Sequence, residues 1–350
     1  MIGLVSNGYG EDAIAASIAQ AWSAQGKTAI VAVALVGDGA HYRRVGVIPA
    51  ATFPVLPSGG FVRSIRQLVG DVGSGLVRVV IRQRRAIYDA LEHADRVIVV
   101  GDVWALGLTR WALGKPVWFL PTAKSHRFMR HSWLECWCMR RWCLQVFPRD
   151  RETADELQAV GISADYMGSP IMTLPPPADT VPNGPRYIGV LPGSRNEAYT
   201  NLAKIMAYLS DQLGDYRLLI GAPPQLDANR LHAIAPNDAV WTHDISTVIE
   251  NSGVIIGMAG TANEQAAVYG RTVLVFPGTG PQTTAKRFQE QVQLMGDRIQ
   301  YVVDDPATVC AAVLQYWEAP SPIDWSVSGL FAQRIVWYNS QPRKHNDRHA

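Results

Sequence analysis

A short segment in the second half of the chain combines residue types that bind phosphate. Gly193, Ser194 and Arg195 come directly after the apolar run at residues 187–191 and open a helical pattern. The start of a helix presents free backbone N–H groups and the positive end of the helix dipole, and an arginine adds a guanidinium. The segment therefore predicts a diphosphate site. Ser194 and Glu197 also fit a capping box, and such a cap would present the same amides.

A second glycine-containing turn follows another strand-like apolar run. Gly260, Thr261 and Ala262 open a helix of small residues, and close backbone approach at this turn would admit a phosphate group. Either Glu264 or Gln265 in the first helical turn could hydrogen-bond a ribose diol. Taken alone, the segment fits a packing turn equally well.

A third loop offers an amide side chain to a sugar. Gln282 follows the apolar run at residues 272–276, and its amide can both donate to and accept from hydroxyl groups. Loops outside the carboxyl ends of the strands form the ligand crevice of an open α/β sheet. We therefore expect the three loops to converge on one nucleotide sugar.

The first strand-like run ends in a polar turn made of Asn7, Gly8, Gly10, Glu11 and Asp12. Its spacing satisfies G-x-G-x-x-A, but a dinucleotide site requires an acidic residue about 20 positions further on. Asp38 lies about 30 positions beyond Gly8, which argues against a nicotinamide cofactor. We interpret the turn as an acceptor-side loop whose glycines admit a substrate, with a glycine turn capped by Asp12 as the alternative.

The elements around these motifs alternate between strands and helices. Buried strands are predicted at residues 2–6, 29–35, 96–100, 117–120, 187–191, 216–220, 254–257 and 272–276. Helical patterns separate them, which predicts an α/β fold with two doubly wound sheets. Six prolines lie between positions 170 and 185, as expected for a connector. We predict an N-terminal domain at 1–168, a linker at 169–185, a C-terminal domain at 186–325, and a terminal helix and tail at 326–350, with a return of this helix to the N-terminal domain as one arrangement.

Composition agrees with two domains and shows an uneven charge distribution. The chain has 350 residues, 48% hydrophobic and 18% charged, and domains typically have about 100 to 200 residues. Residues 1–150 hold 18 of the 32 Lys and Arg but only 10 of the 30 Asp and Glu. The basic half predicts contact with an anionic membrane surface or an acidic substrate, with an uneven solvated surface as the alternative. We expect no nucleic acid partner.

Two stretches predict peripheral membrane contact. Residues 61–85 place seven apolar side chains near helical spacing, starting with Phe61, among six arginines that end with Arg85. Residues 127–142 combine four arginines, starting with Arg127, with three tryptophans that end with Trp142. Basic amphipathic segments with tryptophans suit a headgroup layer, and a basic surface over an ordinary core is the alternative. With no leader sequence and no bilayer-spanning run, we expect a cytoplasmic protein on the inner face of the membrane.

Cysteine spacing does not favour a metal site. Cys136, Cys138 and Cys143 interleave with tryptophans, and their spacing differs from that of a zinc knuckle. We interpret these thiols as small apolar residues of a buried helix. No metal is expected.

The order of these motifs resembles that in lipid-A-disaccharide synthase and, more distantly, that in the glycosyltransferase that makes peptidoglycan lipid II. The resemblance covers most of the chain and rests on residues 6–12, 101–102, 191–197 and 260–267. It implies the GT-B architecture, in which two doubly wound Rossmann-like domains face each other across a cleft. It also implies that the C-terminal domain holds a nucleotide-diphosphate sugar.

The resemblance assigns roles to individual residues. It implies that Arg195 and its two neighbours contact the diphosphate, that Thr261 and Ala262 form the second phosphate or ribose loop, and that Ile245 lies near uracil. Its Gly-x-Asp stretch falls at Asp102, which becomes the first choice for the catalytic base. Asp12 and Glu11 come next.

Three departures from the family pattern place the chain in a divergent, synthase-related group. The family's ribose-binding glutamate falls on Gln265, with Glu264 one position earlier. Residues 6–12 and 121–128 also differ from the family pattern, which leaves the acceptor open.

The predicted function is a metal-independent hexosyl transfer from a nucleotide-diphosphate sugar, a UDP-sugar first, to a lipid or other membrane-associated acceptor. No cofactor is expected besides the donor. The alternatives are a nucleotide-sugar 2-epimerase of the same fold and a catalytically silent sugar-nucleotide-binding protein.

Overall fold

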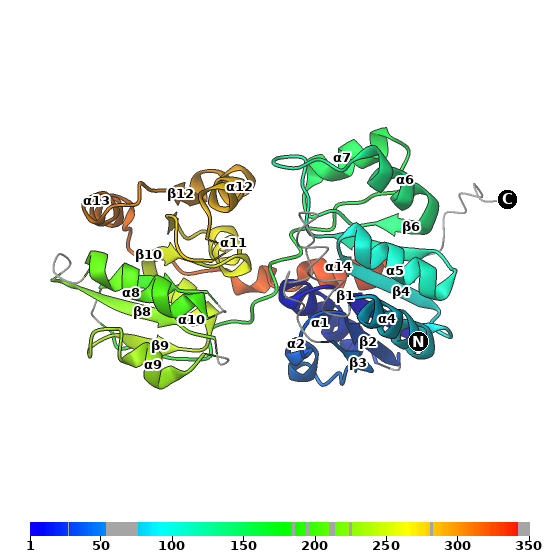
Figure 1. The fold of residues 1–350 in the computed structure, drawn as a ribbon, viewed down its shortest axis with the longest axis horizontal. Coiled ribbons are helices and arrows are strands. Elements are labelled where there is room, and N and C mark those ends of the chain that lie inside the picture. Colours follow the sequence, from blue (N-terminus) through cyan, green and yellow to red (C-terminus); the bar gives the residue numbers. More distant parts are fainter. Residues whose placement is uncertain are drawn as a thin grey trace. The chain divides into compact units, whose positions relative to one another are not determined.

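The computed structural model of the chain forms two compact units, which are drawn in Figure 1. Unit 1 comprises Met1–Thr173 and Gly329–Ala350, and unit 2 comprises Leu174–Ser328. No helix in the described ranges is long and apolar enough to cross a bilayer. The structure describes residues 1–26, 28–53, 76–183, 186–193, 196–209, 214–223, 226–280 and 283–341.

Unit 1 is built on a six-stranded parallel sheet with the order β3-β2-β1-β4-β5-β6. Ile2 pairs with Ile30 on one side and with Arg96 on the other. The strands are β1 (Ile2–Ser6), β2 (Ile30–Ala34), β3 (Ala51–Thr52), β4 (Arg96–Gly101), β5 (Val117–Pro121) and β6 (Cys143–Val146). The helices are α1 (Tyr9–Ala24), α2 (Ala40–Arg44), α4 (Leu76–Leu91), α5 (Val103–Leu113), α6 (Trp133–Trp142), α7 (Arg151–Ala159) and α14 (Leu330–Ser340).

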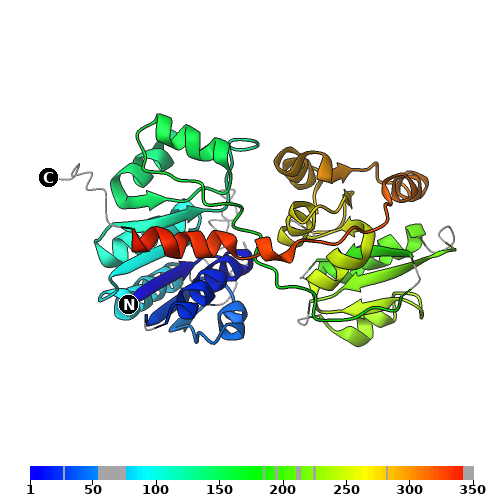
Figure 2. The same cartoon turned by 180° about the vertical axis from the view of Figure 1, so that it is seen from behind.

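Successive side chains of a strand point to opposite faces of the sheet. Because the inner strands of unit 1 are apolar on both faces, helices cover both faces of the sheet. On one face, Val5, Val99 and Phe119 join a buried cluster with residues of α4, α5, α6 and α7. On the other face, the ring of Trp118 lies 5.7 Å from that of Tyr338 in α14. Figure 2 shows α14 (red) beside α1 (dark blue) on this face.

Unit 2 repeats the same winding in a second six-stranded parallel sheet, with the order β12-β11-β10-β7-β8-β9. The strands are β7 (Arg186–Leu191), β8 (Tyr216–Gly221), β9 (Val240–Thr242), β10 (Ser252–Gly257), β11 (Val273–Val275) and β12 (Ile299–Tyr301). The helices are α8 (Glu197–Leu209), α9 (Ala228–His232), α10 (Ile245–Asn251), α11 (Thr261–Val268), α12 (Ala285–Met295) and α13 (Pro306–Tyr316), with 3-10 turns at Gly296–Arg298 and Trp325–Val327.

The eight strands predicted from apolar runs are present, and the described residues contain four more, β3, β6, β9 and β12. The interpretation of the cysteines was wrong in one respect. α6 ends at Trp142 and Cys143 begins β6, while Trp133 of α6 is 80% exposed. α6 is therefore a surface helix, of which Cys138 is a buried residue. Residues 61–75 of the predicted amphipathic stretch lie outside the described residues, and its remainder falls in α4.

Candidate functional site

Each sheet reverses its strand order beside its first strand, which is where open α/β sheets bind ligands. The reversal lies between β1 and β4 in unit 1 and between β7 and β10 in unit 2. Asn7 and Asp102 directly follow the first pair of strands, and Pro192 and Met258 directly follow the second. Asn7 and Asp102 are predicted site residues, and Gly193, which follows Pro192, is the predicted site residue next to the switch point of unit 2.

In unit 2, the loops after β7 and β10 touch each other. The N–H of Met258 donates to the carbonyl of Leu191 at 2.8 Å. Gly193 has φ of 101°, and a Cβ added there would lie 3.0 Å from the Met258 carbonyl oxygen. Glycine is required at this position because both the backbone angle and the space exclude a side chain. Ser194 and Arg195 lie outside the described residues.

The loop after β10 leads into α11 with exposed backbone at its start. Gly260 is the N-cap and makes no side-chain cap hydrogen bond, and Thr261 is exposed while Ala262 is half-buried. Glu264 and Gln265 are only 8% and 6% exposed, and each interacts with another group of the protein. Both candidates for the ribose diol are therefore packed into the first turn of α11 rather than projecting from it.

The loop after β11 is held by α8. The Asn201 Oδ1 accepts from the N–H of Thr279 at 2.8 Å, and its Nδ2 donates to the carbonyl of the same residue at 3.2 Å. One turn further along α8, the Lys204 ammonium donates to the carbonyl of Pro277 at 2.7 Å. The helix that follows the predicted diphosphate loop thus fixes the third loop as well. Gln282 lies outside the described residues.

The segment predicted to read the base begins a short helix. Ile245 is half-buried and is the first residue of α10, which Asp244 caps by accepting from the N–H of Ser246 at 3.0 Å. The Pro-rich segment anchors this turn: the N–H of Ala178 donates to Asp244 at 2.8 Å, and Ser246 Oγ donates to the carbonyl of Pro175 at 2.6 Å. Ile245 therefore lies on a turn with a fixed backbone.

In unit 1, two half-buried carboxylates meet at the switch point. Asp102 is the N-cap of α5, and its Oδ1 accepts from the N–H of Ala105 and from the Asn7 amide, both at 3.0 Å. Glu11 accepts from the Thr122 hydroxyl at 2.8 Å. These contacts join the ends of β1, β4 and β5 and bring Asn7, Glu11 and Asp102 together.

Burial changes the acidity of both carboxylates. It raises the pKa of Glu11, and the negative charge of Asp102 adds to this rise, while the hydrogen bond from Thr122 and the charge of Arg149 oppose it. Burial also raises the pKa of Asp102, against the hydrogen bonds from the backbone and Asn7. A carboxylate with a raised pKa is a stronger base than an ordinary carboxylate, which suits it to accept a proton.

Two glycines of the polar turn differ in their role. A Cβ at Gly8 would lie 2.5 Å from the Glu11 Oε2, so the missing side chain lets the carboxylate fold back over the turn. Gly10 lies in the first turn of α1.

Asp12 lies beneath this surface. Its side chain is fully buried, and its Oδ1 accepts from the Ser6 hydroxyl at 2.6 Å, which in turn lies 2.7 Å from the Tyr42 hydroxyl. Among the residues that the structure describes, the Asp12 Oδ2 has no hydrogen-bond partner. Burial, with the charges of Glu11 and Asp38 acting in the same direction, raises the pKa of Asp12 to about 7, against the hydrogen bond from Ser6.

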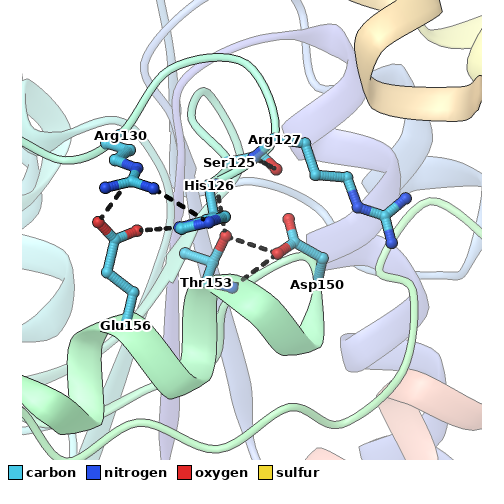
Figure 3. A network of polar contacts seen from close by, with 7 residues as sticks. All are labelled: Ser125, His126, Arg127, Arg130, Asp150, Thr153 and Glu156. Carbon is cyan, nitrogen blue, oxygen red and sulfur yellow. Dashed lines mark hydrogen bonds and ion pairs between the residues drawn. The ribbon is translucent and has the colours of Figure 1, made fainter.

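A polar network ties the loop after β5 to α7 (Figure 3). The His126 Nδ1 lies 3.0 Å from Glu156 Oε2, and an Arg130 guanidinium nitrogen lies 3.2 Å from the other ring nitrogen. The backbone N–H of His126 donates to Thr153 at 2.9 Å, and Thr153 donates to Asp150 at 2.6 Å. The loop after β5 begins at Thr122, which donates to Glu11, and these contacts hold it against α7.

No sequence pattern indicated several residues of these sites. Thr122 and Arg149 lie in different loops, and the Arg149 guanidinium donates to the Thr122 carbonyl at 3.0 Å. Asn201 and Gln291 lie inside helices and reach the loops only through the fold. Thr122 and Arg149 follow strands, and Asn201 and Gln291 lie in helices beside the loops. Their place in the sites could be predicted only from the order of the strands in each sheet.

Unit 1 also exposes four tryptophans on α5 and α6, which we call the tryptophan face: Trp104, Trp111, Trp133 and Trp137. The Arg84 guanidinium of α4 lies 4.7 Å from the ring centre of Trp111. The ring of Trp142 links α6 to α5, since it lies 5.8 Å from that of Trp137 and 3.7 Å from a Cβ added at Gly107. The exposed rings therefore lie on two neighbouring helices, and an arginine stacks on one of them.

Comparison with solved structures identifies the fold. The chain is similar to the glycosyltransferase of kitacinnamycin (TM-score 0.61, 14% identity, 96% of this chain and 94% of that chain). It is also similar to S. aureus MnaA solved with UDP (TM-score 0.60, 14% identity, 97% and 96%) and to a UDP-N-acetylglucosamine 2-epimerase (TM-score 0.59, 13% identity, 97% of each chain). No family model and no curated protein sequence matches the chain.

These similarities, together with two parallel six-stranded sheets of the same winding, define the GT-B fold. Among the similar structures are glycosyltransferases and UDP-N-acetylglucosamine 2-epimerases. Identities of 13 to 14% establish the fold and leave the reaction to be argued from the residues.

Proposed function

We propose that the protein is a UDP-sugar-dependent hexosyltransferase of a divergent group related to lipid-A-disaccharide synthase. The observation that carries this proposal is the set of three loops at the switch point of unit 2, where Gly193 contacts Met258 and α8 holds Thr279. Solved structures of the same fold bind UDP or a UDP-sugar. In this proposal unit 2 binds the donor, with Arg195 on its diphosphate.

In the proposed reaction, the oxygen of an acceptor hydroxyl attacks the anomeric carbon of the donor sugar. The bond from that carbon to the diphosphate oxygen breaks, and the nucleoside diphosphate leaves with the electron pair. Asp102 takes the hydroxyl proton, and Glu11 is the second candidate. Backbone N–H groups and the Arg195 guanidinium stabilise the leaving diphosphate. The helix ends and the arginine supply the positive charge in this scheme.

We propose a lipid or other membrane-associated acceptor. The tryptophan face, with Arg84 stacked on Trp111, lies on unit 1, the same unit that carries both carboxylates. Interfacial tryptophans and arginines attract an anionic leaflet, where such an acceptor resides. The protein then acts as a peripheral enzyme at the inner face of the membrane.

A 2-epimerase is the second candidate, because epimerases share this fold. One set of measurements separates the candidates. Thermal shift against UDP, dTDP, GDP and their sugars identifies the donor, since a ligand that binds the native state raises the melting temperature. We expect UDP and a UDP-sugar to give the largest shift. The donor is then incubated alone and with membrane lipid extract.

The products decide between the reactions. A transferase releases UDP and forms a glycosylated lipid only with the extract, whereas an epimerase converts the donor alone. Binding without either product would indicate a silent binding protein, and no shift with any nucleotide would contradict the proposal as a whole.

A further inference from the structure

One buried amide side chain controls the backbone of the second donor loop. Gln291 lies in α12 and is 1% exposed. Its Nε2 donates to two consecutive carbonyls of the loop after β10, that of Gly260 at 3.0 Å and that of Ala259 at 3.4 Å. Its Oε1 accepts from the Asn263 amide at 3.3 Å, which also donates to the carbonyl of Gly257 at 3.2 Å.

These bonds determine the direction of two backbone N–H groups. In a planar trans peptide, the C=O and the N–H that follows it point in opposite directions. By holding the carbonyls of Ala259 and Gly260, Gln291 turns the N–H groups of Gly260 and Thr261 away from α12. Gly260 is the N-cap and has no side chain that could accept from these donors, and Thr261 is exposed.

We propose that Gln291 is a positioning residue that sets the Gly260 and Thr261 amides for the diphosphate of the nucleotide. The inference rests on the proposed donor site and adds to it the residue that gives its second loop a fixed geometry. An amide is suited to this task because it donates to carbonyls and accepts from Asn263 at the same time. Preset donors bind an anion without a further cost of ordering the loop.

The test compares a nucleotide with its nucleoside. Gln291→Leu keeps the apolar volume but loses the donated hydrogen bonds, and we expect the Kd of UDP to rise roughly tenfold, the scale of one or two net hydrogen bonds. The Kd of uridine, measured by displacement, should stay unchanged because uridine lacks the diphosphate. The matched control is Gln83→Leu, since Gln83 is also a buried helical glutamine whose amide donates to a backbone carbonyl, that of Leu35 at 2.8 Å, in unit 1. It should lower the melting temperature comparably and leave both Kd values unchanged.

A conservative variant adds a rescue experiment. The buried carboxyl of Gln291→Glu has a raised pKa, and only its protonated form can donate to the Gly260 carbonyl. The ratio of the Gln291→Glu Kd for UDP to the wild-type Kd should therefore approach one as the pH falls from 8 to 5. The same ratio for Gln291→Leu should not change with pH. Equal weakening of UDP and uridine, or no rescue by Gln291→Glu at low pH, would overturn the inference. Failure of the wild type to bind UDP would instead refute the proposed donor.

Discussion

The carboxylates of Asp102 and Glu11 in unit 1 have different hydrogen-bond partners. Asp102 caps α5 and holds Asn7 through the same oxygen, whereas Glu11 is bound by Thr122 and approached by Arg149. The cap fixes the Asp102 carboxylate at the start of a helix, which gives a proton acceptor a defined position. This favours Asp102 as the base and Glu11 as the group that shapes its surroundings.

Asp102→Asn removes the charge but keeps an oxygen that can accept from Ala105. We expect kcat to fall at least about 100-fold, the lower limit for loss of general base catalysis, with little change in melting temperature. Glu11→Gln should lower kcat by a smaller factor. Steady-state turnover of both variants checks this, and the reverse order of the two losses would transfer the role of base to Glu11. In the wild type, kcat should decline as the pH falls through the raised carboxylate pKa, because the base must be ionised.

The raised pKa of Asp12 predicts how the free energy of unfolding depends on pH. Its pKa is about 7 in the folded protein and 3.8 as an ordinary aspartate, so the folded state binds the proton more tightly. The stability that this proton contributes is complete below pH about 4 and is lost as the pH rises through about 7. Asp12→Asn cannot ionise. The free energy of unfolding of this variant should exceed that of wild type by more at pH 8 than at pH 5.

Urea unfolding at the two pH values measures the difference. Asp102 titrates in both proteins and cancels in the comparison, whereas Glu11, whose charge acts on Asp12, contributes to the difference. A difference that stays constant between pH 5 and 8 would mean that Asp12 does not titrate in this range.

At the scale of elements, the sequence predicted the centre of each sheet and missed its edges. The eight predicted strands are the inner strands of the two sheets, and β3, β6, β9 and β12 are the four edges. Inner parallel strands are buried on both faces and give continuous apolar runs. Edge strands are short here, such as Ala51–Thr52 and Val240–Thr242, and such segments carry too few residues to give a pattern.

The glycine loops were visible in the sequence because close backbone approach requires a particular residue, as at Gly193. The side chains that hold these loops in place could not be identified from the sequence. Asn201 bonds to Thr279 across 78 positions, and Gln291 bonds to Gly260 across 31. Amides at such separations give no local signal, since their partners are defined only when α8 and α12 pack beside the loops.

In the whole molecule, the two units have the same strand order but different side chains at their switch points and surfaces. Unit 2 gathers glycine loops and buried amides, as expected for a site that binds through backbone N–H groups. Unit 1 gathers carboxylates, arginines and exposed tryptophans, and residues 1–150 hold 18 of the 32 basic residues. A repeated architecture therefore carries one donor-binding sheet and one sheet with catalytic and interfacial residues in the proposed function.

The tryptophan face predicts that the protein binds anionic vesicles. If it contacts the bilayer, the double variant Trp111→Ala with Trp133→Ala should reduce partition onto vesicles of phosphatidylglycerol by tenfold or more, since each ring that leaves the interface costs about 1 to 2 kcal/mol. Binding should also weaken in 0.5 M salt, at which ionic interactions between exposed charges more than roughly 5 Å apart are largely screened. Sedimentation with the vesicles measures the partition.

Trp337 supplies the matched control. It is 57% exposed, as is Trp111, but it lies on α14, which packs with α1 on the other face of the unit 1 sheet. Trp337→Ala removes the same side chain without touching the tryptophan face, so vesicle binding should not change. Equal loss in both proteins would indicate non-specific hydrophobic adsorption. Unchanged binding in the double variant would remove the membrane from the proposed function and leave the acceptor to be sought among water-soluble molecules.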